Sequence, residues 1–95
     1  MLENRVKRVL AEGGVTLGTM IMEFSTTGIS RVVASAGAEF VVFDMEHTGW
    51  SMETIRMLIA TCRSTTMVPL VRVADTHYHL MARPLDMGAM GLMVP

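Results

Sequence analysis

The sequence predicts an α/β domain with a parallel sheet, and three observations support this prediction. Apolar runs typical of strands alternate with segments whose apolar residues recur at helical spacing. The strand-like runs are continuously apolar, as in FVVF, which is typical of strands covered on both faces. Helical connections between successive strands favour right-handed βαβ units, whose strands are parallel.

The first helix and strand are expected at residues 6–14 and 15–22. The apolar residues of VKRVLAEGG have helical spacing, and Gly13 is expected to stop the helix. The run VTLGTMIM that follows is expected to form a strand, in which Gly18 allows a close approach of the backbone.

The second helix and strand are expected at residues 28–37 and 39–44. Thr27 or Ser30 is the expected N-cap of the helix, and Gly37 is expected to end it. The strand EFVVFD contains one of the most apolar runs of the chain, so it is expected to be covered on both faces.

The third helix and strand are expected at residues 51–63 and 68–73. Ser51 is a favourable N-cap, and Glu53 lies near the positive end of the helix dipole. Pro69 is tolerated because it lies at the start of the strand. The apolar stripe of the helix is formed by Ile55, Leu58, Ile59 and Cys62.

The last helix and strand are expected at residues 78–88 and 90–95, with Pro84 kinking or ending the helix and Gly88 closing it. A complete (β/α)8 barrel takes about 250 residues, and an open flavodoxin-like sheet normally has five strands. Four strands, the last of them an uncovered edge, favour the N-terminal half of a TIM barrel. We therefore expect residues 1–95 to form one partial barrel domain, truncated after the fourth strand.

The composition excludes several classes of protein. Hydrophobic residues make up 51% of the 95 residues, which excludes a disordered chain. Eight basic and nine acidic residues give a net charge of −1 without a run of either sign, so no nucleic-acid partner is expected. The charged first residues lack the apolar core of a signal peptide, and no window approaches the ~20 apolar residues of a membrane span. Cys62, the single cysteine, is interpreted as a packed thiol in a cytoplasmic protein.

Ionisable side chains gather where two of the predicted strands end. Asp44, Glu46 and His47 come directly after FVVF, and Arg72 lies near the carboxyl end of the third strand. His47 and Arg72 are 25 residues apart (72 − 47), about one βα repeat, so they are expected to be neighbours on one rim. Functional groups of parallel α/β folds gather at this rim.

The residue types leave two interpretations of this cluster open. Arg72 could pair with Asp44 or Glu46 and brace the rim, because an unpaired buried charge is costly. Alternatively, an imidazole beside a guanidinium suits abstraction of a proton α to a carbonyl, with the arginine holding a carboxylate or a developing enolate.

Three segments, taken together, resemble the N-terminal half of the HpcH/HpaI aldolase family. They are FVVFDMEHTGWSMETIRMLI, PLVRV and ARPLDMGAMGLMVP, and the resemblance runs from LGTMIMEFS to Pro95. The motifs D-x-E-H, V-R-V and L-D-x-G-A-x-G-x-x-V-P form a composite signal in this order, whereas D-x-E-H alone is weak. The family comprises class II, divalent-metal-dependent pyruvate aldolases with a TIM barrel of the phosphoenolpyruvate/pyruvate-domain type, related to citrate lyase β subunits.

The resemblance implies roles for five residues. His47 matches the general base, and Arg72 matches the arginine that contacts pyruvate and stabilises its enolate. Asp86 matches an acidic residue near the active site; it, or Asp44, would orient His47 and stabilise its protonated form. Glu46 would hold metal-bound water.

The resemblance also implies the reaction and its partners. A pyruvate enolate would attack an aldehyde, or form in the reverse cleavage of a 2-oxo acid. The divalent metal (Mg, Mn or Co) would be held by a Glu and an Asp beyond Pro95, so no metal ligand is expected in this chain. His77 and His79 have the H-x-H spacing of some metal sites, but the residues Tyr78 and Leu80 indicate a loop that enters a helix instead. The full-length protein would be a cytoplasmic homo-oligomer, as a hexamer, and the 95-residue chain alone would be inactive.

Two other interpretations remain open from the sequence. The chain could be a non-catalytic βα module or assembly fragment, whose rim charges form structural ion pairs. It could also belong to a citrate-lyase-like enzyme that acts on a CoA thioester, although D-x-E-H favours a free 2-oxo acid.

Overall fold

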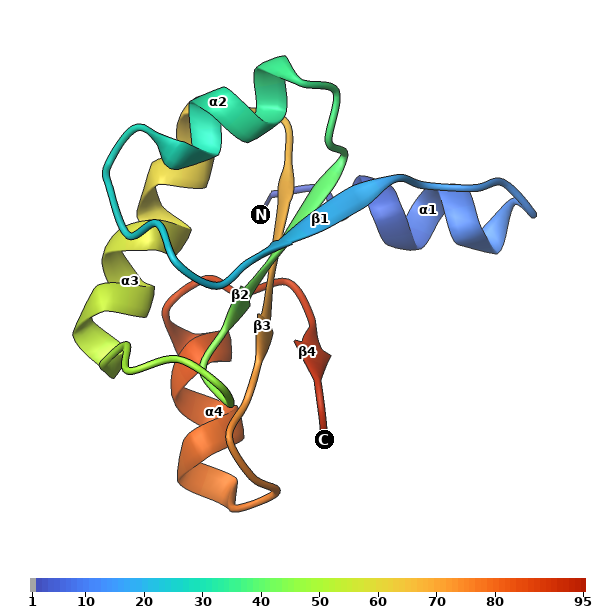
Figure 1. The fold of residues 1–95 in the computed structure, drawn as a ribbon. Coiled ribbons are helices and arrows are strands. Elements are labelled where there is room, and N and C mark those ends of the chain that lie inside the picture. The colour runs from blue at the N-terminus through green and yellow to red at the C-terminus, as the bar shows by residue number, and fades with distance from the viewer. Residues whose placement is uncertain (1) are drawn as a thin grey trace.

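The computed structural model describes residues 2–95 and confirms the predicted α/β fold (Figure 1). Four parallel strands form one sheet in the order β1 (Gly18–Ile21), β2 (Phe40–Asp44), β3 (Val68–Arg72) and β4 (Leu92–Met93). The helices are α1 (Arg5–Ala11), α2 (Ile29–Ser35), α3 (Met52–Thr61), the short 3-10 helix η1 (Cys62–Ser64) and α4 (Tyr78–Asp86). Among residues 2–95, none of the helices has the length and apolar character needed to cross a membrane.

The core lies between the sheet and the helices α2, α3 and α4, which cover one side of it (Figure 1). Val41, Phe43 and Val71 enter this core from the strands, and each is fully buried. Burial of an apolar side chain of this size contributes about 1.5–3 kcal/mol. The predicted apolar stripe is confirmed, because its four residues are all buried in the same core: Ile55, Leu58, Ile59 and Cys62. In contrast, α1 lies apart and buries no residue.

Several predicted local signals are confirmed. The Ser51 hydroxyl accepts a hydrogen bond from the Thr54 N–H over 3.1 Å and so caps α3. Burial raises the pKa of the Cys62 thiol, as expected for a packed cysteine. The glycines predicted to end helices all have positive φ: Gly13, Gly37 and Gly88.

The predicted cap of α2 is wrong. Gly28 occupies the N-cap position without a side-chain hydrogen bond, and neither Thr27 nor Ser30 caps the helix. Ser30 is instead buried against α3, where its hydroxyl lies 2.7 Å from Thr61 Oγ1. The Ser30 hydroxyl, which the sequence pattern offers as a cap, therefore takes part in a hydrogen bond with α3 instead.

Pro84 does not end α4, which continues to Asp86. Because Pro84 lies in the last turn, its missing N–H leaves only the Leu80 carbonyl without its usual helical partner. The two edge strands are also shorter than predicted: β1 begins at Gly18 and β4 contains only two residues. Each of them has a neighbouring strand on one side only, so its ends lack a second row of hydrogen bonds.

Gly18 permits the close pairing of β1 with β2 that the sequence predicted. It is the register partner of Phe40, and a Cβ at this position would overlap the Phe40 carbonyl oxygen and ring. We expect Gly18→Ala to lower the free energy of unfolding by about 1–3 kcal/mol, measured by urea denaturation followed by circular dichroism. Gly28→Ala is the matched control, because its Cβ would meet nothing within 4 Å. Equal stability of the two variants would contradict the close approach.

Candidate active site

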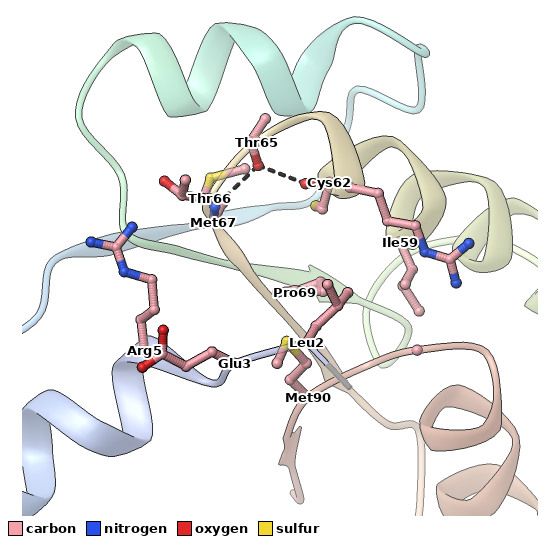
Figure 2. A pocket seen from close by; sticks show the side chains of 12 residues that line it. Leu2, Glu3, Arg5, Ile59, Cys62, Thr65, Thr66, Met67, Pro69 and Met90 are labelled. Carbon is pink, nitrogen blue, oxygen red and sulfur yellow. Dashed lines mark hydrogen bonds between the residues drawn. The ribbon is translucent and has the colours of Figure 1, made fainter.

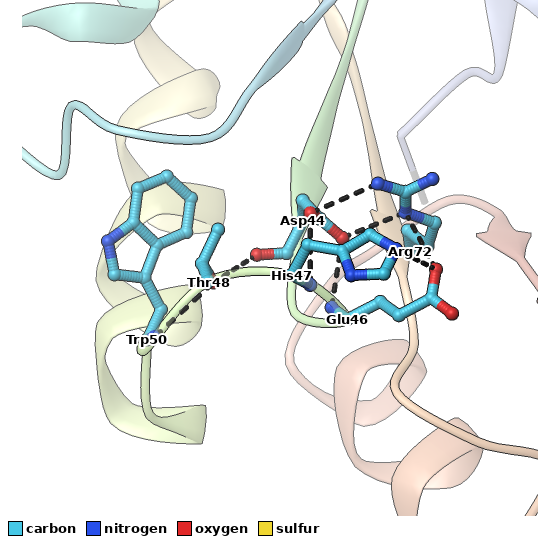
Figure 3. Close-up of polar contacts among 6 residues, drawn as sticks. All are labelled: Asp44, Glu46, His47, Thr48, Trp50 and Arg72. Carbon is cyan, nitrogen blue, oxygen red and sulfur yellow. Dashed lines mark hydrogen bonds and ion pairs between the residues drawn. The ribbon is translucent and has the colours of Figure 1, made fainter.

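The candidate site lies at the carboxyl ends of β2 and β3 (Figure 3). Parallel pairing places Asp44, the last residue of β2, in register with Arg72, the last residue of β3. The loop that follows β2 carries Glu46 and His47 over the same edge. His47 and Arg72 therefore share one rim, as their spacing along the chain predicts.

Asp44 is fully buried, and its carboxylate accepts four hydrogen bonds. Arg72 donates from Nε to Oδ1 over 2.8 Å and from Nη2 to Oδ2 over 3.1 Å. The backbone N–H of Glu46 donates to Oδ1 over 2.9 Å, and that of His47 donates to Oδ2 over 3.2 Å. One carboxylate thus fixes both the guanidinium and the loop that bears the imidazole.

These hydrogen bonds determine the acidity of Asp44. Those from Arg72 hold the pKa of the Asp44 carboxyl at about 2, below its ordinary value of 3.8, against the opposing effect of burial. The backbone N–H groups of Glu46 and His47 lower this pKa further. In return, the hydrogen bonds to Asp44 raise the pKa of Arg72. The pair therefore stays charged at neutral pH, and Asp44 is not a proton acceptor there.

The low pKa of Asp44 predicts a loss of stability in acid. Because the folded-state pKa lies below the unfolded value, this group's contribution is complete above about pH 4 and is lost as the pH falls through about 2. We expect the free energy of unfolding, measured in urea, to fall over this range. A ¹³C NMR titration of the Asp44 carboxyl should have its midpoint near 2. A midpoint near 3.8 would show that the Arg72 contacts do not persist in solution.

Glu46 connects His47 with Arg72. Its Oε1 lies 3.1 Å from His47 Nε2 and 3.4 Å from Arg72 Nε. The side chain of His47 is 61% exposed, whereas that of Arg72 is 19% exposed. The imidazole therefore lies at the open side of the rim, above a guanidinium that is held deeper.

Arg72 keeps donors that Asp44 does not use. A guanidinium has five N–H groups, and Asp44 engages one on Nε and one on Nη2. No hydrogen bond within residues 2–95 engages Nη1. These remaining N–H groups can donate to a carboxylate or to an enolate oxygen.

Asp86 is not brought to this site within one copy of the chain. It is the exposed last residue of α4 and lines a groove with Arg56 and Arg63 on the helical side. Since α4 connects two parallel strands, its end lies at the edge where the strands start, and Met90 N–H accordingly donates to the Pro69 carbonyl at the start of β3. The predicted contact of Asp86 with His47 is therefore absent from the described residues of a single chain.

Asp44 does not orient the imidazole either, because its contact with His47 is to the backbone N–H. Thr48, which the sequence analysis did not single out, completes the loop. Its hydroxyl donates to the Asp44 carbonyl over 2.6 Å and accepts from the Trp50 N–H over 3.3 Å. A threonine before glycine in a loop is a turn signal that could have indicated this role.

The described residues do not form a metal site by themselves. Within residues 2–95, no three His, Cys, Asp or Glu side chains are arranged to hold an ion. Both oxygens of Asp44 already accept hydrogen bonds from N–H groups, and Oε1 of Glu46 faces Arg72 and His47. Both oxygens of Asp44 are therefore engaged by N–H donors and are not free to coordinate a divalent cation.

A cavity of about 170 Å³ lies at the opposite edge of the sheet (Figure 2). Its apolar lining includes Leu2, Met67 and Met90. Asn4 donates from Nδ2 to the Met90 carbonyl over 3.0 Å, which ties the N-terminal segment to the loop before β4. None of the predicted site residues lines this cavity, and in TIM barrels this edge contributes to stability rather than to catalysis.

Comparison with known proteins finds aldolases among the curated relatives of the chain. No family model matches the chain. A curated relative, a hydroxypyruvate/pyruvate aldolase from Roseovarius nubinhibens, is 32% identical over 92 residues, which cover 97% of this chain and 35% of the relative. The chain thus spans about a third of the length of the curated relatives that it matches.

Solved structures agree with this similarity. The HpcH/HpaI aldolase from Desulfitobacterium hafniense DCB-2 matches with a TM-score of 0.88 and 30% identity, over 95% of this chain and 35% of that one. The citrate synthase SbnG matches with a TM-score of 0.86 and 32% identity, over 95% of this chain and 36% of that one. The curated relatives and the structural neighbours of the chain are thus members of the HpcH/HpaI aldolase/citrate lyase family, and the chain matches about a third of their length.

Proposed function

We propose that the chain supplies the proton-transferring and anion-binding part of a carbon–carbon lyase that acts on pyruvate or a related 2-oxo acid. The observation that carries this proposal is the continuous contact from Arg72 through Glu46 to His47 at one rim. Arg72 is fixed there by its ion pair with Asp44, so its charge is in place before a substrate binds. The aldolase relatives support the class of reaction.

Each residue has a distinct part in the proposed reaction. The free N–H groups of Arg72 bind the substrate carboxylate or the developing enolate oxygen. His47 accepts a proton from the methyl carbon beside the keto group; the C–H bond breaks and its electron pair remains in the enolate. The enolate carbon then forms a bond to the carbonyl carbon of an aldehyde, whose oxygen takes up a proton. Cleavage of the aldol follows the same steps in reverse.

We also propose that the reaction depends on a divalent cation (Mg, Mn or Co) whose ligands lie outside residues 2–95. The hydrogen bonds that N–H groups donate to both oxygens of Asp44 support metal ligands elsewhere. In the same proposal the 95-residue chain alone is inactive, and the active protein is a cytoplasmic homo-oligomer, as a hexamer.

A chimera tests the proposal directly. This chain replaces the matching 92-residue segment of the Roseovarius aldolase, and the product is purified and checked for folding by circular dichroism. We expect pyruvate-releasing aldol cleavage that is lost on chelation and restored by Mg²⁺ or Mn²⁺. The chimera with Arg72→Lys, which cannot reproduce the paired hydrogen bonds, is the matched control and should be slower. A folded chimera without turnover would exclude the function.

A second candidate is condensation of the enolate with the keto carbon of a second oxo acid, such as oxaloacetate, favoured by the similarity to the citrate synthase SbnG. The same chimera distinguishes the two functions when it is assayed with different carbonyl acceptors. Faster product formation with oxaloacetate as the acceptor than with an aldehyde would favour the second candidate.

A further inference from the structure

The cavity at the amino edge of the sheet combines an apolar lining with positive charge (Figure 2). Its volume is about 170 Å³, and an apolar cavity of about 150 Å³ can hold a molecule of the size of benzene. Its apolar lining is formed by the side chains of Leu2, Ile59, Met67, Pro69 and Met90. The cavity therefore has the size and lining for a compact apolar group.

Two arginines bring positive charge to this lining. Arg5 comes from the start of α1, and Arg63 comes from η1. Neither forms an ion pair with another residue of the range 2–95, whereas Glu3, which also lines the cavity, pairs with Arg8. The charge of the two guanidinium groups is thus not compensated by a carboxylate within the described residues, which favours an anionic ligand.

The other polar groups of the lining do not oppose an anion. Burial raises the pKa of the Cys62 thiol, so this side chain stays neutral. The Thr65 hydroxyl donates to the Cys62 carbonyl over 2.7 Å and accepts from the Met67 N–H over 3.1 Å, which fixes its orientation. Thr66 is exposed at the cavity, and its hydroxyl can donate a further hydrogen bond.

The cavity lies where segments that are far apart in the sequence meet. Asn4 Nδ2 donates to the Met90 carbonyl over 3.0 Å, and the Met90 N–H donates to the Pro69 carbonyl over 2.8 Å. The N-terminal segment, the start of β3 and the loop before β4 are therefore joined beside it. A ligand that contacts all three segments binds only the folded chain and so stabilises it.

We propose that this cavity is a second binding site, specific for a small monocarboxylate with a compact apolar body. The apolar body fills the space beside Met67 and Met90, and the carboxylate accepts charge-assisted hydrogen bonds from Arg5 and Arg63. The site lies at the edge of the sheet opposite to Arg72, so its ligand takes no part in the proposed reaction. The ligand instead holds the N-terminal segment against β3 and β4.

Benzoate is the probe for this site, and benzamide, which has nearly the same shape but no charge, is its control. The ¹³C-methyl NMR signals of Met67 and Met90 are followed in the chimera. We expect benzoate to shift both signals with one common Kd, and benzamide to bind about tenfold more weakly, because it lacks the charge that the two arginines attract.

Substitutions of the arginines test the origin of the affinity. Arg5→Gln and Arg63→Gln should each raise the Kd of benzoate about threefold, as expected for a partly exposed ion pair. Arg31→Gln is the matched control, because Arg31 is exposed on α2 and does not line the cavity, and it should leave the Kd unchanged.

The outcomes separate this site from the proposed function. Methionine signals that do not shift up to the solubility limit of benzoate would overturn the site, and equal Kd values for benzoate and benzamide would overturn its specificity for a carboxylate. A folded chimera without lyase activity would overturn the proposed function alone, because binding is measured without turnover. The comparison of the two probes in the unsubstituted chimera decides the proposal even if an arginine variant does not fold.

Discussion

Asp44→Asn is expected to lower the free energy of unfolding by about 3–5 kcal/mol, the cost of leaving one partner of a buried ion pair unpaired. Asparagine has nearly the same shape, but it has no charge and only one acceptor oxygen. Asparagine therefore cannot accept all four of the hydrogen bonds that Asp44 accepts, and Arg72 loses its counter-charge. Because a small domain is stable by about 5–15 kcal/mol, this substitution removes a large part of the total.

Urea denaturation followed by circular dichroism measures this effect. Asp75→Asn is the matched control, because the Asp75 side chain is 62% exposed and its replacement should change stability by less than about 0.5 kcal/mol. If Asp44→Asn unfolds at the same urea concentration as the control, the ion pair does not hold this rim together.

In contrast to Asp44→Asn, His47→Gln is expected to lower the rate of proton transfer strongly and to change the free energy of unfolding only slightly. General acid–base groups contribute about 10²–10⁴-fold to rate, so proton exchange at the pyruvate methyl group should fall by that factor in the chimera. The side chain is 61% exposed, so stability should stay within about 0.5 kcal/mol. Loss of the methyl ¹H NMR signal in D₂O measures the exchange. His79→Gln, at an exposed position of α4, is the control. Exchange at the unsubstituted rate in a folded His47→Gln variant would exclude His47 as the base.

The parts of the fold that the sequence predicts are those governed by local signals. The buried run from Val41 to Phe43 is apolar without interruption, and Ser51 provides a hydroxyl at the start of α3. The common edge of His47 and Arg72 follows from one βα repeat, because parallel strands end on the same side. For the same reason, the sequence alone predicts at which edge of the sheet most of the candidate site lies.

The prediction that was wrong, the cap of α2, and the prediction that a single chain does not test, the contact of Asp86 with His47, both depend on tertiary contacts. Ser30 has the side chain of a cap, but its hydroxyl is used by Thr61 in the interior. Asp86 matches a motif, but the motif alone does not indicate at which edge of the sheet this residue lies. The direction of α4 places Asp86 away from His47 in a single chain. Local sequence therefore identifies the chemical groups, whereas packing decides which of them meet.

Asp44 shows why the two sequence interpretations of the rim are compatible. It braces Arg72, as the purely structural interpretation requires, through a bidentate ion pair. Because this pair uses only part of the guanidinium and leaves Glu46 to contact His47, the brace also prepares the remaining groups for a substrate.

Titration of the chimera with oxalate, a planar dianion that resembles a pyruvate enolate but cannot react, tests whether His47 and Arg72 serve one binding place. The ¹H–¹⁵N signals of the His47 ring and of the Arg72 guanidinium are followed together. We expect both to shift with one common Kd, and both shifts to be lost in Arg72→Lys. Oxalate that shifts the signals of one residue and leaves those of the other unchanged would contradict a shared site.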